Sequence, residues 1–416
     1  MSEFYSELLE RFLRYVVIDT GSLPNVKEVP STRHQFDLAY LLKDELVELG
    51  VSNIYLDEIN CVVYGTIPST LENGKGKSIG LVAHMDTSPD VSSENIKPWV
   101  YKNYQGGDIV LNKDLQIIMK EEEFPHLKNY YGDDLVLTDG TTLLGGDDKA
   151  AISEIMTMAH YFIKHPEIKH GPIQIAFTPD EEVGGLACNL DLKRFGAVAA
   201  YTVDGDYVGY YSDETFNATE AQLTITGKNV HPGTAKGIMK NAVGIANEII
   251  DLLPPLERPE FTEGREGYFH PHYIQGNVEK SELHILIRDH DDNSFYHRQQ
   301  IINDITKKMN EKYGEGTVVL RYANGYLSMK KVVDTVPYLI PSLVKAISKC
   351  NIEPYHLAFR GGTDGSALSQ RGLPCPNISA GYENGHSRFE FVPVQSMEKI
   401  TEILIQLFIE LAKEDA

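Results

Sequence analysis

Hydrophobic and polar residues in the first half of the chain follow two alternating patterns. Helical spacing of apolar positions predicts helices, and continuous apolar or β-rich runs predict strands between them. The predicted helices span 2–18, 34–49 and 148–164, and the predicted strands span 53–58, 61–67, 78–84, 172–179 and 197–203. Ser31 or Thr32 can cap the second helix, and Gly50 ends it. This alternation predicts an α/β fold with a mixed, largely parallel sheet.

The pattern changes near residue 214 and changes back near residue 327. Between these points the predicted order is strand, helix, two strands, helix and strand, the split βαβ pattern of a ferredoxin-like α+β domain. The strands are expected at 217–226, 267–276, 279–291 and 316–324, and the helices at 240–253 and 293–313. Helical patterns near 335–350 and in the last residues return to the α/β type. We therefore expect one discontinuous domain, residues 1–213 and 328–416, that carries residues 214–327 as an insert.

Composition narrows the classes of function. The 416 residues are 42% hydrophobic and 24% charged, which is ordinary for a globular protein of two domains. A formal charge of -22 would repel nucleic acids and anionic membranes, so neither is expected as a partner. The sequence has no signal-peptide pattern and no apolar stretch long enough to span a membrane. We expect a cytoplasmic protein whose four scattered cysteines are buried, reduced thiols.

Five residues with metal-binding side chains stand where predicted strands pass into loops. They are His84, Asp147, Glu182, Asp204 and His386. Two histidines and three carboxylates suit a pair of zinc or similar ions bridged by one carboxylate. Ligands of α/β sheets gather beyond the carboxyl ends of the strands, so several of these side chains are expected to converge. Each alone is explained as well by a helix cap, a turn or a solvated histidine; together they predict a two-metal hydrolase.

Four further residues have candidate roles around such a site. Asp86 lies on the same side of a strand as His84 and can orient its imidazole. Glu181, within a run of three carboxylates, is the candidate base for a metal-activated water. On the insert, His231 would stabilise a developing oxyanion and Arg288 would bind a carboxylate, unless both are simply solvent-exposed.

Seven motifs, in this order, resemble those of the peptidase T family of tripeptide aminopeptidases, within the wider group of co-catalytic zinc peptidases and deacylases. The motifs are HMDT, LLGGDDKAA, FTPDEEVG, YTVDGD, NVHPGTAKG, RGGTDG and GLPCPN, and they cover nearly the whole chain. The resemblance implies that the discontinuous domain is a catalytic dizinc domain and that the insert is a lid and dimerisation domain. The sequence departs from the family pattern at two places. Phe389 stands where a second histidine is expected, and GGDDK replaces GADDK.

The resemblance implies a role for each matching residue. Asp147 would bridge two zinc ions, with cobalt or manganese as alternatives. His84 and Asp204 would complete the ligands of one ion, and Glu182 and His386 those of the other. Arg360 and Asp364, in the RGGTDG segment, would help to form the substrate pocket. The substrates would be short peptides, chiefly tripeptides, and the protein would be a homodimer joined through its lids.

Two other functions compete with this one. A desuccinylase- or aminoacylase-like deacylase would use the same ions on N-acyl amino acids, but it would recognise an acyl chain instead of a free α-ammonium group. The motifs shared with the tripeptidases favour the aminopeptidase. A non-catalytic metal-binding protein is the third possibility, and the intact Glu181 together with all five ligands argues against it.

Overall fold

The computed structural model describes residues 3–185 and 187–414, which fold into two compact units. The first unit comprises the residues up to Asp213, Met329–Leu357, and the residues from Thr363 onward. The second comprises Glu214–Ser328 and the short segment Ala358–Gly362. In the order of the chain, the second unit is therefore an insertion within the first.

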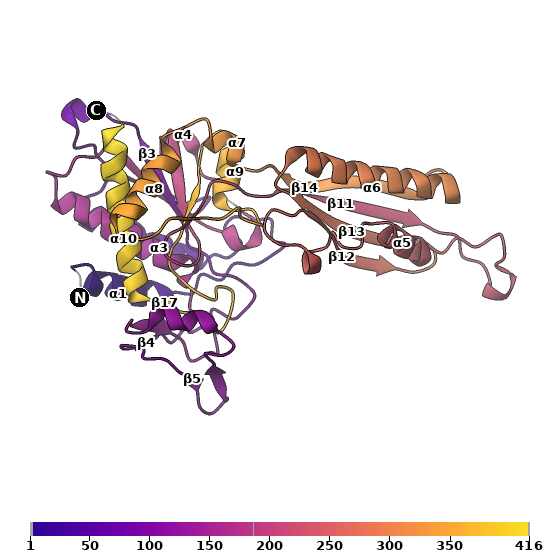
Figure 1. Cartoon of the computed structure of the whole chain (residues 1–416), viewed down its shortest axis with the longest axis horizontal. Coiled ribbons are helices and arrows are strands. Elements are labelled where there is room, and N and C mark those ends of the chain that lie inside the picture. Colours follow the sequence, from indigo (N-terminus) through magenta and orange to yellow (C-terminus); the bar gives the residue numbers. More distant parts are fainter. Residues whose placement is uncertain (1–2, 186, 415–416) are drawn as a thin grey trace. The chain divides into compact units, whose positions relative to one another are not determined.

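An eight-stranded sheet forms the centre of the first unit (Figure 1), in the order β1-β2-β8-β3-β9-β16-β10-β15. The strands are β1 Ser52–Asp57, β2 Val62–Ile67, β3 Ile79–His84, β8 Ile173–Thr178, β9 Ala199–Val203, β10 Tyr210–Ser212, β15 Tyr355–His356 and β16 Asn377–Ile378. Strand β3 runs parallel to both β8 and β9, and β9 runs parallel to β16. Strand β2 is antiparallel to both of its neighbours. The prediction of a mixed sheet with a parallel centre is confirmed.

Helices cover this sheet. The long ones are α1 Tyr5–Val16, α2 Gln35–Leu49, α3 Gly146–Lys164, α8 Leu339–Lys349 and α10 Val394–Lys413, and the short ones are α4 Leu192–Phe195, α7 Lys330–Val333 and α9 Asp364–Gln370. Helix α3 packs on β3, α1 and α10, and α10 also lies beside α8 (Figure 1). Ile152, Ile155 and Phe162 of α3 are almost fully buried, which explains the apolar spacing in this segment.

The ends of α2 show one correct and one wrong expectation. Gly50 ends the helix in the left-handed region, at φ 82°, and its N–H bonds to the carbonyls of Leu46 and Val47. Neither Ser31 nor Thr32 caps the start, because α2 begins only at Gln35. The hydroxyl of Ser31 donates to Asp180 (2.5 Å) and that of Thr32 donates to the Gly21 carbonyl (2.7 Å). Ser31 and Thr32 therefore hold a loop in place and do not cap a helix.

Residues 85–145 contain short strands that the hydrophobic pattern did not predict. Strands β4 Trp99–Tyr101, β7 Leu135–Leu137 and β17 Val392–Pro393 form a three-stranded sheet, and β5 Ile109–Asn112 pairs with β6 Ile117–Met119. Tyr104, Leu127 and Phe391 belong to a separate small core here. Strands of three or four residues give too few alternations to be recognised from sequence.

The second unit has the predicted split βαβ order. Its elements are β11 Asn217–Thr226, α5 Ala242–Asp251, β12 Tyr268–Gly276, β13 Lys280–Asp289, α6 Asp292–Tyr313 and β14 Val318–Tyr326. The antiparallel sheet has the order β12-β13-β11-β14. Side chains from α5 and α6 share one core with alternate residues of the strands, so both helices lie on the same face of the sheet. The predicted ferredoxin-like fold is confirmed.

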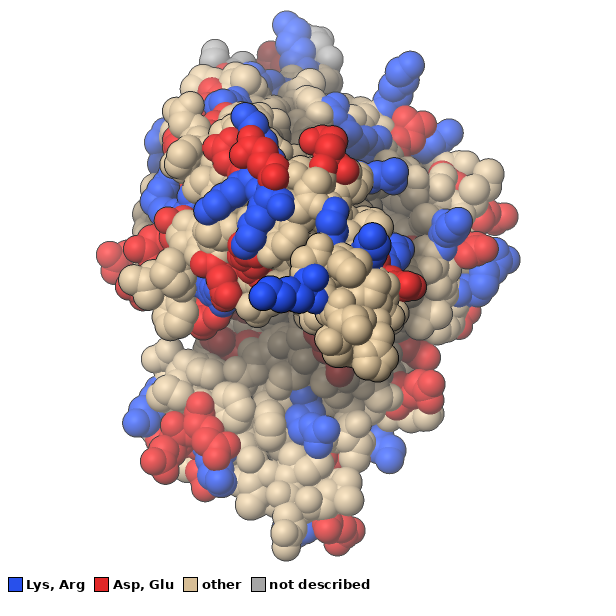
Figure 2. Space-filling view, turned by 90° about the vertical axis from the view of Figure 1, so that its right-hand side faces the viewer, with Lys and Arg blue, Asp and Glu red and all other residues tan. Residues whose placement is uncertain are grey.

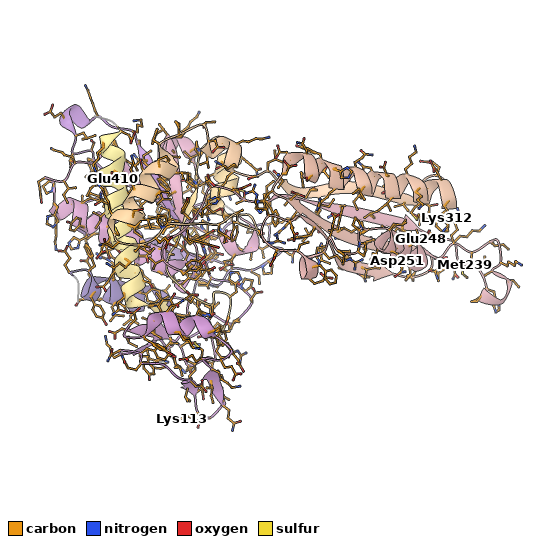
Figure 3. The ribbon with its side chains drawn as sticks, in the orientation of Figure 1. Lys113, Met239, Glu248, Asp251, Lys312 and Glu410 are labelled. Carbon is orange, nitrogen blue, oxygen red and sulfur yellow. The ribbon has the colours of Figure 1, made fainter. Side chains whose placement is uncertain are left out.

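An ion pair joins the two helices of this unit. Glu248 on α5 accepts hydrogen bonds from the Lys312 ammonium (2.5 Å) and the Tyr313 hydroxyl (2.7 Å) on α6. Figure 3 shows Glu248 and Lys312 close together at the ends of these helices. The pair fixes α5 against α6 outside their shared apolar core.

On the face shown in Figure 2, Lys and Arg side chains are interspersed with Asp and Glu side chains. Within the described residues, no helix is both long and apolar enough to cross a membrane. All four cysteines are free thiols. The expectation that they are buried is confirmed for Cys61 and Cys375, but it is wrong for Cys188, which is exposed, and Cys350 is only half-buried.

One titratable contact links α10 to α8. Burial would raise the pKa of Glu410, but hydrogen bonds from Lys349, Lys413 and Gln406 lower it to about 2. The lysine of α8 lies 2.5 Å from the carboxylate and Lys413 lies 2.6 Å from it. Figure 3 shows the position of Glu410 on α10. A carboxylate whose pKa falls on folding stabilises the fold only where it is ionised.

We therefore predict a pH-dependent effect of Glu410→Gln. An unfolded glutamate has a pKa of about 4.3, so this stabilisation is complete above that pH and is lost as the pH falls towards 2. The variant should lower the free energy of unfolding by about 1 kcal/mol at pH 7 and by less than half of that at pH 3. Urea unfolding followed by the fluorescence of Trp99, the single tryptophan, measures both values.

A matched control is Glu402→Gln on the same helix, where the carboxylate pairs with one half-exposed lysine, Lys399 (2.7 Å). We expect a smaller change there. An equal loss of stability at pH 7 and pH 3 for Glu410→Gln would contradict the assignment.

Candidate metal centre

His84 is the last residue of β3 and is almost fully buried. Its Nδ1 lies 3.1 Å from the backbone carbonyl oxygen of Asp86 and 3.4 Å from the Asp86 carboxylate. Because both of these groups only accept hydrogen bonds, Nδ1 carries the hydrogen. Nε2 faces Asp147, whose Oδ1 lies 3.0 Å away, and in the neutral ring this nitrogen would carry the lone pair that binds a metal. The imidazole is thus oriented as a metal ligand requires.

Asp147 stands between two histidines. Its Oδ1 faces His84, and its Oδ2 lies 3.4 Å from Nε2 of His386. The same Nε2 lies 2.8 Å from Oε2 of Glu182. The two oxygens of one carboxylate therefore face two separate histidines. A carboxylate that bridges two ions has this arrangement.

Two groups of side chains at this place can each hold a metal ion. One is His84, Asp147 and Asp204, and the other is Asp147, Glu182 and His386; within each group the ligand atoms lie within 4.8 Å of one another. Asp147 belongs to both. Asp148 belongs to neither group, and its Oδ2 accepts a hydrogen bond from the backbone N–H of His84 (3.1 Å). Oε1 of Glu182 is buried and accepts no hydrogen bond from any described residue, so it is available to a cation.

The electrostatics of the centre also favour cations. Burial, with the charge of Asp147, raises the pKa of Glu182 to about 7 and that of Asp204 to about 6. Burial, with the charge of Asp204, holds the pKa of Glu181 well above its usual value. Hydrogen bonds to Asp147 and Glu182 raise the pKa of His386 to about 11. Buried carboxylates this close together need positive charge, so these residues fit two divalent ions.

Asp86 connects the end of β3 to the loop after β8. Its carboxylate is fully buried and accepts hydrogen bonds from the backbone N–H groups of Glu181 (2.9 Å) and Glu182 (3.2 Å). Asp180 fixes the same loop from the other side, because it accepts hydrogen bonds from the backbone N–H of Ser31 (2.7 Å) and from Gln35 (2.8 Å). One loop therefore carries both Glu181 and Glu182 in a defined position.

Two supporting residues were missed in the sequence. The buried carboxylate of Glu390 accepts hydrogen bonds from the backbone N–H groups of Leu144 and Gly145, both at 2.7 Å, and of Asp147, at 2.9 Å. The hydroxyl of Tyr382 donates to Asp204 (3.1 Å). The signal for Glu390 was an acid flanked by two phenylalanines in NGHSRFEF, a segment too apolar for a solvated carboxylate.

The remaining predicted residues lie in different units. Asp364 begins α9 in the first unit, where it accepts a hydrogen bond from the Thr178 hydroxyl (2.9 Å), and burial raises its pKa to about 7. His231 is exposed in the second unit. Arg288, in the same unit, donates to the Arg360 carbonyl (3.0 Å) and keeps a buried Nε with no hydrogen-bond partner among the described residues.

The guanidinium of Arg360 is occupied by its own unit. It donates to the carbonyls of Gly264 (2.8 Å) and Glu266 (2.9 Å) and to the Thr262 hydroxyl (2.9 Å). It also lies over the ring of Phe216, 5.1 Å from the centroid. This arginine fixes the segment that contains residues 262–266.

Comparisons with known proteins agree with this architecture. A family model described as a peptidase dimerisation domain matches residues 214–317. Several solved structures share the fold. One is the aminopeptidase PepT of Bacillus cereus, with a TM-score of 0.79, 21% identity and coverage of 98% of this chain and 99% of that one. Another is a dinuclear metal-binding M20 peptidase of Bacillus subtilis, with a TM-score of 0.66, 12% identity and coverage of 99% of both chains.

The similarity in sequence is much closer. A peptidase T of Clostridium botulinum (strain Loch Maree) is 48% identical over 401 residues, which cover 96% of this chain and 98% of that protein. The similarity therefore extends over nearly the whole of both chains. The chain belongs to the peptidase T family.

Proposed function

We propose that this protein is a metal-dependent aminopeptidase that releases the N-terminal residue from tripeptides. The observation that supports this most directly is Asp147, whose two oxygens face His84 and His386. A site that holds two ions through one shared carboxylate is suited to the hydrolysis of an amide bond. The free thiols are compatible with a reducing cytoplasm, where we place this activity.

We propose zinc as the metal. His84, Asp147 and Asp204 would hold one ion, and Asp147, Glu182 and His386 the other. Imidazole nitrogens and carboxylate oxygens in small groups suit zinc better than magnesium or calcium, which prefer oxygen ligands alone. Bound at this place, two zinc ions would acidify a water molecule and polarise the scissile carbonyl group.

Glu181 is the proposed proton carrier. It precedes the ligand Glu182 in a loop that Asp86 fixes through both backbone N–H groups. Burial and the neighbouring carboxylate of Asp204 raise its pKa, which makes its carboxylate a stronger base than a solvated one. We propose that it takes a proton from the attacking water and then delivers that proton to the leaving amine.

The second unit is proposed to contribute to substrate binding. His231 would donate a hydrogen bond to the developing oxyanion, and Arg288 would bind the C-terminal carboxylate of the peptide. Arg288 suits this task because its Nε has no partner among the described residues. Arg360 would act through the segment that it fixes, and Asp364 would line the pocket from the first unit.

The proposed specificity predicts a clear order among three substrates. With zinc added, the tripeptide Met-Gly-Gly should lose its N-terminal methionine, whereas Met-Gly and N-acetyl-Met-Gly-Gly should react at least about 100-fold more slowly, because each lacks a charged group in the required place. Chromatography of the released amino acid measures all three rates. Preferred cleavage of the acetylated peptide would establish a deacylase instead.

Glu181→Ala is predicted to separate metal binding from turnover. It should lower kcat by roughly 10²- to 10⁴-fold, the usual contribution of a general base, and leave the metal content of the protein unchanged. Metal analysis and kinetics on the same sample test both statements. The matched variant is Glu182→Ala, one residue along the loop, which should lose metal as well as activity. Full activity in Glu181→Ala would disprove the assignment.

We also propose that the protein is a homodimer joined through its second unit. The match of residues 214–317 to a peptidase dimerisation domain supports this arrangement. Light scattering should then give twice the chain mass of 46.6 kDa. A particle with the mass of a single chain that retains full activity would contradict the proposal.

A further inference from the structure

A third group of metal-binding side chains lies in the second unit. Besides the two groups of the catalytic centre, the described residues contain one more set whose ligand atoms lie within 4.8 Å of one another, formed by Glu220, His272 and His284. Oε1 of Glu220 lies 2.9 Å from Nε2 of His272 and 3.7 Å from Nδ1 of His284. None of these residues takes part in the reaction proposed above.

The three residues come from three neighbouring strands. Glu220 belongs to β11, His272 to β12 and His284 to β13, and these strands lie side by side (Figure 1). Ala221 and Ile285, the next residues along β11 and β13, are in the core beneath α5 and α6. Because side chains alternate along a strand, Glu220 and His284 point to the face opposite the helices.

A β-bulge brings the third residue to this face. Pro271 pairs with Ile285 and Tyr273 pairs with His284, so His272 is an extra residue without a partner on β13. Bulges redirect a side chain locally, and they are common beside functional sites. Here Nε2 of the redirected His272 imidazole lies 2.9 Å from Oε1 of Glu220.

Glu220 is an unusual residue for this face. Only 9% of its side chain is exposed, compared with 31% for His272 and 27% for His284. Gln222 donates a hydrogen bond to Oε2 of the carboxylate, which leaves Oε1 directed at the two histidines. A nearly buried negative charge beneath two accessible imidazoles is a typical arrangement for a cation that enters from solvent.

We propose that Glu220, His272 and His284 bind one divalent transition-metal ion, such as zinc, separate from the catalytic pair. Zinc holds imidazole nitrogen and carboxylate oxygen at about 2.0–2.2 Å, so tetrahedral ligand atoms lie about 3.3 Å apart. The two distances from Glu220, 2.9 and 3.7 Å, bracket this spacing. The ion would link β11, β12 and β13 and would retain an open coordination position towards solvent.

The metal content of the full-length protein tests the site. After incubation with zinc sulfate and gel filtration, the wild-type chain should carry one more zinc ion than His272→Ala or His284→Ala. His297→Ala, which removes an exposed histidine of α6 in the same unit, should match the wild type. Equal zinc content in the wild type and His272→Ala would overturn the proposal.

A second readout excludes loss of the ion through misfolding. Glu220→Gln keeps the size of the side chain and one acceptor but removes the charge. Zinc added after the catalytic centre is filled should raise the Tm of the wild type and not that of Glu220→Gln. Peptidase activity should be the same in both, since Glu220 lies outside the catalytic residues. An equal rise in Tm for both proteins would show that zinc stabilises the fold elsewhere and would refute the site.

Discussion

The strongest electrostatic constraint in the first unit is the repulsion among the buried carboxylates around Asp147. Taking one carboxylate out of water costs several kcal/mol, and Asp147, Glu182 and Asp204 share one small volume. Two histidines and two divalent ions would balance that charge, and hydrogen bonds from the backbone hold the segments that carry Asp147 and Glu182. The fold thus brings together a group of acidic side chains that bound cations would stabilise.

Backbone N–H groups that donate hydrogen bonds to acidic side chains hold the segments around these carboxylates in place. Asp86 accepts two of them from the loop after β8, and Glu390 accepts three from the segment that leads to Asp147. Each of these acids is itself buried, so its hydrogen bonds are made in a medium of low dielectric constant, where they are strong. The candidate ligands are consequently held in place by residues that would not themselves contact an ion.

The sequence predicted the architecture well where a strand or helix was long enough to show a clear pattern of apolar residues. Strands β3, β8 and β9 were recognisable as apolar runs, and their parallel pairing explains why His84, Glu182 and Asp204 lie at one edge of the sheet. Interactions between distant loops could not be predicted in this way. The role of Glu390, the contact of Ser31 with Asp180 and the bulge at His272 depend on how segments meet in space, and no local pattern specifies them.

The hydrogen bond from the Asp147 backbone to Glu390 spans 243 residues of sequence. Contacts of such separation form late in folding, because a long loop must close before they stabilise the chain. If Asp147 bridges two ions, as proposed, this carboxylate and His386 would come together only once the two ends of this long segment have met. In this molecule, uptake of metal would report that folding is complete, and a partly folded chain would have little means of capturing the ions early.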